Sequence, residues 1–268
     1  MTTPQNEISV ADKYRFYESS VQCHDSDIDF INKEYERIYK TLPLKLREDF
    51  GGTGLLACEW VRQSKDHFSW AIDLDVEPIS YGMKNHYSKL DEVEKKRMRY
   101  LEANVLDNFN FKADVVVAFN FSYYIFKKRN ELLQYFKKVR EGLGNKGAFF
   151  IDLFGGTATG EPLVEETEHD NFSYLWDCDK FNPITSECLY YIHFLDLDEN
   201  KKYEKVFTYD WRMWGPSELR EILEDAGFRE TIIYWEGDNG EGEGDGNFYP
   251  TLVADNCESW ITYIIALP

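Results

Sequence analysis

Near the start of the chain, apolar residues recur with the period of an amphipathic helix. Five of them lie three to four positions apart: Ile28, Ile31, Tyr35, Ile38 and Leu42. This spacing places them on one helix face. Ser26 or Asp27 can cap the start, and Pro43 ends the pattern. We expect residues 1–43 to form an N-terminal helical cap, with residues 1–12 frayed because they are mostly polar.

Between residues 44 and 154, strand and helix patterns alternate. The expected strands are 44–49, 68–74, 99–103, 113–120 and 148–154. The expected helices run from Gly54 to about Ser64, from Glu77 into the charged segment 91–99, and along an apolar stripe from Leu132 to Leu143. The run Val115 to Ala118 is entirely apolar, which is typical of a parallel strand buried on both faces. Repeated strand–helix units of this kind predict a doubly wound sheet.

After residue 155 the period changes to the alternation of strands. Three aromatic-rich segments are expected to form antiparallel strands: 172–181, 187–197 and 203–214. A last helix, capped by Ser217 and ended by Gly227, precedes two closing strands at 230–235 and 259–266. The prediction is an α/β protein with a Rossmann-like, doubly wound seven-stranded sheet. Its parts are a cofactor-binding core at 44–154, a β insertion on the substrate side at 155–215, and a last helix with two strands at 216–268.

Composition excludes several classes of protein. The 268 residues include 49 acids and 30 bases, for a net charge of -19, so nucleic acid is not an expected partner. The five cysteines and five histidines lack the spacing of metal ligands, so no metal is expected. The start of the chain has no signal pattern, and no apolar run approaches the roughly 20 residues that span a bilayer. We therefore expect a cytoplasmic protein without a membrane partner; the oligomeric state stays open.

The segment Leu44 to Gly54, LKLREDFGGTG, joins the first strand to a helix through a glycine-rich turn. Gly51, Gly52 and Gly54 fit a turn on which a nucleotide-sized ligand lies. The acids Glu48 and Asp49 would repel a pyrophosphate but attract S-adenosylmethionine, which carries a sulfonium and an ammonium. The glycines by themselves also fit a nicotinamide dinucleotide, with Asp73 at the spacing of its ribose acid.

Two later strand ends extend this candidate site. Asp73 and the following Leu74 close the second strand, where an acid can accept both hydroxyls of a ribose. Asp75 is the alternative acid. Asn104 and Val105 follow the third strand, where a side-chain acceptor and a backbone N–H can hold an adenine.

With these motifs the chain resembles the class I S-adenosylmethionine-dependent methyltransferases. The resemblance covers Leu44 to Phe154 and the last helix with its strands. It implies S-adenosylmethionine as cofactor, bound by the motifs described above. A narrower branch is indicated by LREDF (46–50), NFSY (120–123), FTYDWR (207–212) and YWEG (234–237). Phe50 stands where the family has a glycine two residues after its acid, so Glu48 and Asp49 both remain candidates. Arg47 is a candidate for the carboxylate of the methionine part.

The methyl acceptor is expected beside the fourth strand. Asn120 to Tyr123 is similar to the NPPY motif of amino-methylating relatives, although both prolines are absent. We take Asn120 and Tyr123 as substrate-facing residues, and Asn120 also as a cofactor neighbour. Tyr209 in the insertion is a third candidate wall, because an aromatic ring suits an amine by cation–π contact.

The predicted function is methyl transfer to a nitrogen or oxygen of a small molecule, such as an amine. The alternatives are a nicotinamide-dependent oxidoreductase and a cofactor-binding scaffold without catalysis. The acidic, glycine-rich segment 236–246 is expected to be a loop that gates the site or binds an ion.

Overall fold

The computed structural model describes residues 8–240 and 244–268. It divides into two compact units. The smaller unit consists of Met1–Gln22 and Thr157–Met213, and the larger consists of Cys23–Gly156 and Trp214–Pro268. The expected N-terminal cap, 1–43, is therefore divided between the two units after Gln22.

The larger unit is built on an eight-stranded sheet of order β11-β10-β12-β5-β4-β1-β2-β3. The strands are β1 (Lys45–Asp49), β2 (Phe68–Asp73), β3 (Met98–Glu102), β4 (Ala113–Ala118), β5 (Leu143–Gly155), β10 (Glu230–Asp238), β11 (Gly244–Pro250) and β12 (Trp260–Leu267). Strands β3, β2, β1, β4 and β5 pair in parallel. Strand β12 runs antiparallel to both of its neighbours, β5 and β10. All the parallel strands therefore end at the same edge of the sheet.

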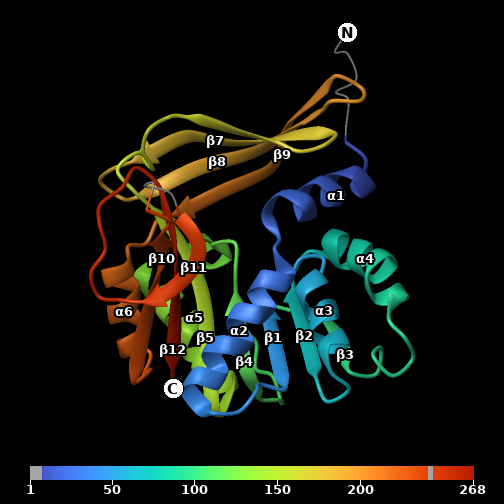
Figure 1. The fold of residues 1–268 in the computed structure, drawn as a ribbon, viewed down its shortest axis with the longest axis vertical. Coiled ribbons are helices and arrows are strands. Elements are labelled where there is room, and N and C mark those ends of the chain that lie inside the picture. The colour runs from blue at the N-terminus through green and yellow to red at the C-terminus, as the bar shows by residue number, and fades with distance from the viewer. Residues whose placement is uncertain (1–7, 241–243) are drawn as a thin grey trace. The chain divides into compact units, whose positions relative to one another are not determined.

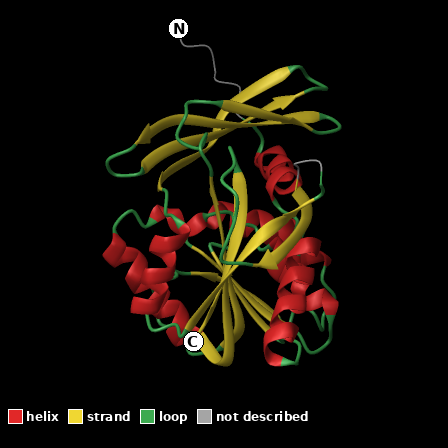
Figure 2. Cartoon of the chain, turned by 60° about the vertical axis from the view of Figure 1, so that its left-hand side comes forward, coloured by secondary structure: helices red, strands yellow, loops and turns green. Residues whose placement is uncertain are grey.

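Helices cover both faces of this sheet, as Figures 1 and 2 show. They are α2 (His24–Tyr39), α3 (Leu55–Gln63), α4 (Val76–Asn85), α5 (Arg129–Gly142) and α6 (Pro216–Asp225), with short 3₁₀ helices η1 (Tyr87–Lys89) and η2 (Ser122–Ile125). Helix α2 packs against α3 and β5, and α5 packs against α6. The prediction of a doubly wound α/β sheet is confirmed.

Strand β4 is at the centre because its side chains are apolar on both faces. Val115 to Ala118 are completely buried, as expected for a parallel strand with helices on each side. Val115 and Val117 belong to the core cluster that contains Trp60 of α3 and Phe150 of β5.

The boundaries of two helices, α4 and α6, differ from the sequence prediction as follows. Helix α4 ends at Asn85, and the charged segment 91–97 forms turns. There the carboxylate of Asp91 accepts the backbone N–H groups of Val93 and Glu94, and such local bonds compete with a helix. Helix α6 starts one residue before Ser217, and Glu218 accepts the N–H of Gly215 in place of the expected Ser217 cap.

An eighth strand, β11, forms where the sequence indicated only a loop. It pairs antiparallel with β10, and the Glu236 side chain accepts the N–H of Gly246 at 3.0 Å. The prediction of a loop through the whole of 236–246 is therefore wrong at both ends. Glu241 and Glu243 of that segment lie outside the described residues.

The smaller unit holds a four-stranded antiparallel sheet of order β6-β7-β8-β9 and one helix, α1 (Val10–Val21). The strands are β6 (Val164–Glu168), β7 (Phe172–Asn182), β8 (Glu187–Asp196) and β9 (Lys201–Arg212). The Phe16 ring on α1 lies 4.3 Å from the Phe172 ring and 5.3 Å from the Phe194 ring, between centroids. Helix α1 was missed from the sequence, which indicated a frayed segment up to residue 12.

Candidate functional site

The glycine-rich turn between β1 and α3 contains three residues in the left-handed conformation. Their φ angles are +56° at Phe50, +52° at Gly52 and +64° at Gly54. A Cβ atom on Gly54 would lie 2.5 Å from a ring carbon of Tyr100, so the turn needs glycine there. Phe50, which stands where the resemblance implies a glycine, adopts this left-handed conformation at some strain, and its ring packs 5.5 Å from that of Tyr135. The backbone therefore accommodates the alternative in which Glu48 is the acid two residues before that position.

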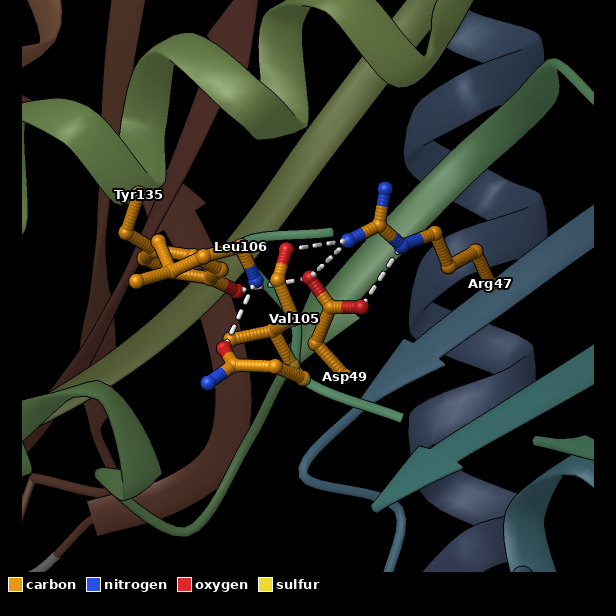
Figure 3. A network of polar contacts seen from close by, with 6 residues as sticks. Arg47, Asp49, Val105, Leu106 and Tyr135 are labelled. Carbon is orange, nitrogen blue, oxygen red and sulfur yellow. Dashed lines mark hydrogen bonds and ion pairs between the residues drawn. The ribbon is translucent and has the colours of Figure 1, made fainter. Parts of the chain in front are cut away.

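Arg47 and Asp49 point to one face of β1 and form a hydrogen-bonded ion pair with each other, as Figure 3 shows. Arg47 Nε donates to Asp49 Oδ1 at 2.6 Å, and Arg47 Nη2 donates to Asp49 Oδ2 at 3.0 Å. Tyr135 donates to the same carboxylate at 2.9 Å, and Arg47 also donates to the carbonyl of Val105 at 3.2 Å. Both charged residues are 1% exposed. The sequence predicted both as ligand-binding groups, but in this geometry they form a closed pair inside the protein.

Glu48 points to the opposite face, because side chains alternate along a strand. Its Oε2 atom accepts the backbone N–H of Ala57, in the first turn of α3, at 3.1 Å. Burial raises the pKa of Glu48 to about 8; the Ala57 bond opposes this shift, and the nearby carboxylates of Asp73 and Asp27 add to it. Glu48 is therefore an acid without a cationic partner at the start of the helix that the glycine turn opens.

Asp73 joins the second predicted motif directly to the first. Its Oδ2 atom accepts the backbone N–H of Gly52 at 2.8 Å, and its Oδ1 atom accepts that of Asp75 at 2.8 Å. Burial raises the pKa of Asp73 in spite of these bonds. Leu74 beside it is 65% exposed. The structure thus brings together residues 21 positions apart that the sequence assigned to one site.

Asn104 and Val105 form a turn after β3, and Figure 3 labels Val105 and Leu106 of this turn. The Asn104 side-chain oxygen accepts the N–H of Leu106 at 2.9 Å, and the Asn104 N–H donates to Asp107 at 3.0 Å. Val105 is buried, and its carbonyl binds Arg47. The Arg47–Asp49 pair therefore ties the turn after β3 to strand β1.

The turn after β4 contains two further non-glycine residues in the left-handed conformation, Asn120 at φ +55° and Phe121 at φ +57°. Both donate their backbone N–H to the carboxylate of Asp152 on β5, at 2.8 and 2.9 Å. Tyr123 is completely buried, and its hydroxyl donates to the carbonyl of Asp152 at 2.8 Å. The expected role of Tyr123, facing the substrate, does not fit a ring enclosed by the core; the ring supports the turn.

Asp27 and Asp152 are acidic residues of this region that the sequence analysis did not assign to the site. Burial, together with the charge of Asp152, raises the pKa of Asp27 to about 7. Burial also raises the pKa of Asp152 to about 7, against its two backbone hydrogen bonds. The sequence did contain a signal for Asp152. An acid within the apolar strand AFFIDLF is unusual and therefore indicates a specific role. For Asp27 the sequence predicted only a helix-capping role.

Four carboxylates of the larger unit thus lack a cation: Asp27, Glu48, Asp73 and Asp152. Among the residues that the structure describes, no ion pair reaches any of them, whereas Asp49 is paired with Arg47. Their electrostatic repulsion links Glu48 to Asp73 and Asp27, and Asp27 to Asp152. Within residues 8–240 and 244–268, no group of three or more potential ligand side chains is arranged to hold a metal ion.

Tyr209 lies on β9 in the smaller unit. Its ring is 4.3 Å from that of Trp211 and 5.6 Å from that of Trp176, between centroids. Burial raises its pKa, and the nearby hydroxyl of Tyr17 adds to the shift. Its surroundings within this unit are those of an aromatic cluster.

No protein-family profile matches the chain, and no curated protein sequence matches it. Many solved structures do. An S-adenosylmethionine-dependent methyltransferase from Clostridium acetobutylicum has a TM-score of 0.69 at 19% identity, covering 97% of this chain and 99% of that one. DesVI from Streptomyces venezuelae has a TM-score of 0.69 at 15% identity, over 98% and 99% of the two chains.

The sugar N-methyltransferase KedS8 from Streptoalloteichus sp. ATCC 53650 has a TM-score of 0.64 at 13% identity, over 100% of this chain and 98% of that one. None of the helices in the described part of the chain is long and apolar enough to cross a membrane. At these identities the likeness concerns the fold: the chain has the α/β fold of the S-adenosylmethionine-dependent methyltransferases, including their antiparallel second sheet.

Proposed function

We propose that this protein is an S-adenosylmethionine-dependent methyltransferase that acts on a small molecule, at a nitrogen or oxygen, with an amine nitrogen favoured. The observation that carries the proposal is the set of uncompensated carboxylates around the glycine turn. Buried acids without a cation are costly, and their raised pKa values record that cost. A ligand with a sulfonium and an ammonium would supply the missing positive charge.

The geometry supports a set of cofactor-binding residues for this proposal. The backbone of Gly51, Gly52 and Gly54 would lie along the ligand, because glycines allow close approach there. Asp73 would accept the ribose hydroxyls while Gly52 holds one of its oxygens in place. Glu48 is the acid of the motif in this proposal, since Asp49 is engaged by Arg47. The turn at Asn104 and Val105, with the neighbouring Leu74, would receive the adenine.

The competing dinucleotide hypothesis is disfavoured by charge. A pyrophosphate on this turn would lie beside Glu48 and Asp73, whose pKa values are already raised by burial, with the charge of Asp73 adding to the shift at Glu48 and that of Asp75 adding to the shift at Asp73. Two further negative charges would add to that repulsion. A scaffold without catalysis is disfavoured by the two strained residues at the end of β4, because such strain is typical of working sites.

The acceptor would bind at the Asn120 turn. When bound, S-adenosylmethionine would supply an electrophilic methyl group: the amine lone pair would attack the methyl carbon in line, and the carbon–sulfur bonding pair would stay on sulfur, which leaves as a neutral thioether. The protein must then orient the partners and exclude water. The amine must reach the methyl group in its neutral form, and carboxylates with a pKa of about 7, such as Asp27, can take up its proton.

An amine acceptor is also supported by the fold neighbours, which include sugar and glycopeptide N-methyltransferases. An amino sugar or a similar small amine is therefore the first class to test. Incubation with S-adenosylmethionine labelled in its methyl group and a panel of amino sugars and amines, followed by separation of products, should reveal transfer.

Calorimetric binding of S-adenosylhomocysteine tests the cofactor half of the proposal. We expect binding that Asp73→Ala weakens about 10- to 100-fold, the usual effect of losing hydrogen bonds to a charged group. Glu59→Gln is the control, because this acid, on α3, pairs with Arg62 instead. Binding of NADH in place of S-adenosylhomocysteine would overturn the proposal.

A further inference from the structure

The turn that follows β4 is fixed to the sheet by a single side chain. Asp152 gives one carboxylate oxygen to the N–H of Asn120 and the other to the N–H of Phe121, at 2.8 and 2.9 Å. The next N–H, that of Ser122, donates to the carbonyl of Phe119 at 3.4 Å, and the Ser122 hydroxyl donates to the same carbonyl at 2.7 Å. Three successive N–H groups are thus engaged, including those at the two positions where the NPPY motif has prolines.

The conformation held in this way is an unfavourable one. Left-handed φ angles are uncommon for residues other than glycine, and two in succession, one of them a phenylalanine, add their costs. Such a conformation persists only when its surroundings fix it. The fixing group is itself rigid, because Asp152 is 7% exposed and its carbonyl accepts the Tyr123 hydroxyl.

The turn lies beside the candidate cofactor site. Val117 of β4 pairs with Glu48 of β1 in parallel register, so Asn120 follows three residues after the position opposite Glu48, at the same edge of the sheet. Asn120 is half-buried, and its side-chain amide makes no hydrogen bond with any residue that the structure describes. A free amide at this place can accept from the N–H of an incoming amine.

We infer that Asp152 is the positioning residue of the methyl-acceptor site: by holding Asn120 and Phe121 in the left-handed turn, it fixes the place of the Asn120 amide that receives the amine. The inference rests on the proposed function, since it presumes a methyl donor on the glycine turn. The inference adds Asp152, on β5 and more than thirty positions from Asn120, to the acceptor site. The effect of Asp152 on the acceptor passes through Asn120.

A purely structural role is the alternative, and the chain contains a matched control for it. Asp114 also accepts two successive backbone N–H groups, those of Leu44 and Lys45, at 2.9 and 3.0 Å. It does so at the opposite end of β4, since Asp114 is the second residue of that strand and Asn120 lies beyond its last. Asp114→Asn removes a comparable anchor far from the acceptor turn.

Sinefungin provides a probe that needs no knowledge of the substrate. In this analogue a carbon bearing an amino group replaces the methyl-bearing sulfonium, so its amine projects toward the acceptor side. The ratio of its affinity to that of S-adenosylhomocysteine therefore reports recognition of an amine, and S-adenosylhomocysteine affinity alone reports folding and the cofactor site.

We expect the wild-type protein to prefer sinefungin, and Asp152→Asn to reduce the ratio of affinities about tenfold while leaving S-adenosylhomocysteine binding within about threefold. Asp152→Glu keeps the charge but displaces its oxygens, and should lose the preference equally; this variant also serves if Asp152→Asn does not fold. Asn120→Ala should also lose the preference for sinefungin. Adding Asp152→Asn to that variant should reduce the ratio of affinities little further, because both substitutions act through one amide. Asp114→Asn should keep the wild-type ratio.

The inference fails if Asp152→Glu retains the preference, since charge alone would then explain it, or if the effects of Asp152→Asn and Asn120→Ala are additive. It also fails if the wild-type protein binds S-adenosylhomocysteine but shows no preference for sinefungin. If the wild-type protein binds neither compound, the proposed function itself is wrong. The two failures are therefore distinguishable.

Discussion

The Asp73 carboxylate accepts the backbone N–H of Gly52 at 2.8 Å, so the end of β2 and the turn after β1 are parts of one structure. The same carboxylate accepts the N–H of Asp75 with its other oxygen. A residue expected to bind a ribose therefore also fixes the glycine turn on which the rest of the ligand would lie.

Replacing Asp73 should weaken both the expected binding of the ribose and the anchoring of the glycine turn. We expect Asp73→Asn to weaken S-adenosylhomocysteine binding at least about tenfold, since an amide can keep only part of these bonds. Asp75→Ala is the control: its carboxylate caps α4 by accepting the N–H of Glu77, so it should cost about 1 kcal/mol of stability and leave affinity unchanged. Calorimetry and urea unfolding measure the two effects. A larger affinity loss at Asp75 would make Asp75 the ribose acid.

Binding of a cationic cofactor should depend on pH through Glu48. Its pKa in the free protein is raised to about 8, chiefly by burial, so much of it is protonated at neutral pH. A sulfonium nearby favours the ionised form, and binding should therefore release protons and strengthen as the pH rises from 6 to 8. Calorimetry in buffers of different ionisation enthalpy counts the protons. Glu48→Gln should reduce the release; an unchanged count would assign the protons to another group.

The stability of the free protein should show the opposite dependence on pH. The folded-state pKa of Glu48, about 8, lies above its unfolded value, so the neutral carboxyl is favoured by folding. This contribution is complete below the unfolded pKa and is lost as the pH rises through 8. Between pH 6 and pH 8 the wild-type protein should lose up to about 2 kcal/mol more unfolding free energy than Glu48→Gln. Parallel pH profiles from urea unfolding would contradict the assignment.

The buried pair of Arg47 and Asp49 should be far more sensitive to loss of one partner than of both. Asp49→Asn leaves the guanidinium buried without its counter-charge, which typically costs about 3–5 kcal/mol. The double variant Arg47→Met, Asp49→Leu should recover a large part of that loss, because no charge is left to desolvate. Denaturant unfolding of the single variants Arg47→Met and Asp49→Leu and of the double variant tests the coupling. Additive losses would show that the two residues act independently.

Gly82 on α4 should be irreplaceable by alanine. A Cβ atom at this position would lie 1.8 Å from the carbonyl oxygen of Thr53, a backbone atom of the glycine turn. Gly82→Ala must therefore push α4 away from that turn, with a loss of about 1–3 kcal/mol or more in stability and a weaker affinity for S-adenosylhomocysteine. Gly144→Ala is the control, because its Cβ would meet only ordinary contact at 3.5 Å. Equal effects at both positions would refute this close-approach explanation.

The parallel core could be predicted because its signals are local. Each strand was marked by an apolar run such as Val115 to Ala118, and each turn by glycine or a capping residue. The eighth strand and α1 were missed because this local apolar signal is weak in both. Strand β11 is a short, exposed edge strand, and the start of α1 is mostly polar. Helix α1 also depends on contacts distant in sequence, such as Phe16 with Phe172, whereas β11 pairs with β10, the strand before it.

The sequence by itself predicted that the glycine turn, the acids Glu48 and Asp49, and a third acid at the end of β2 lie at one edge of the sheet, because the order of strands and turns already brings their ends there. It left open whether Glu48 or Asp49 faces a ligand, and whether Arg47 does. Only the tertiary structure shows that alternation along β1 places Arg47 and Asp49 in a buried pair and leaves Glu48 on the other face. It also decided that Asp152 holds the Asn120 turn, since a side chain more than thirty residues away becomes a neighbour only when β4 and β5 pair.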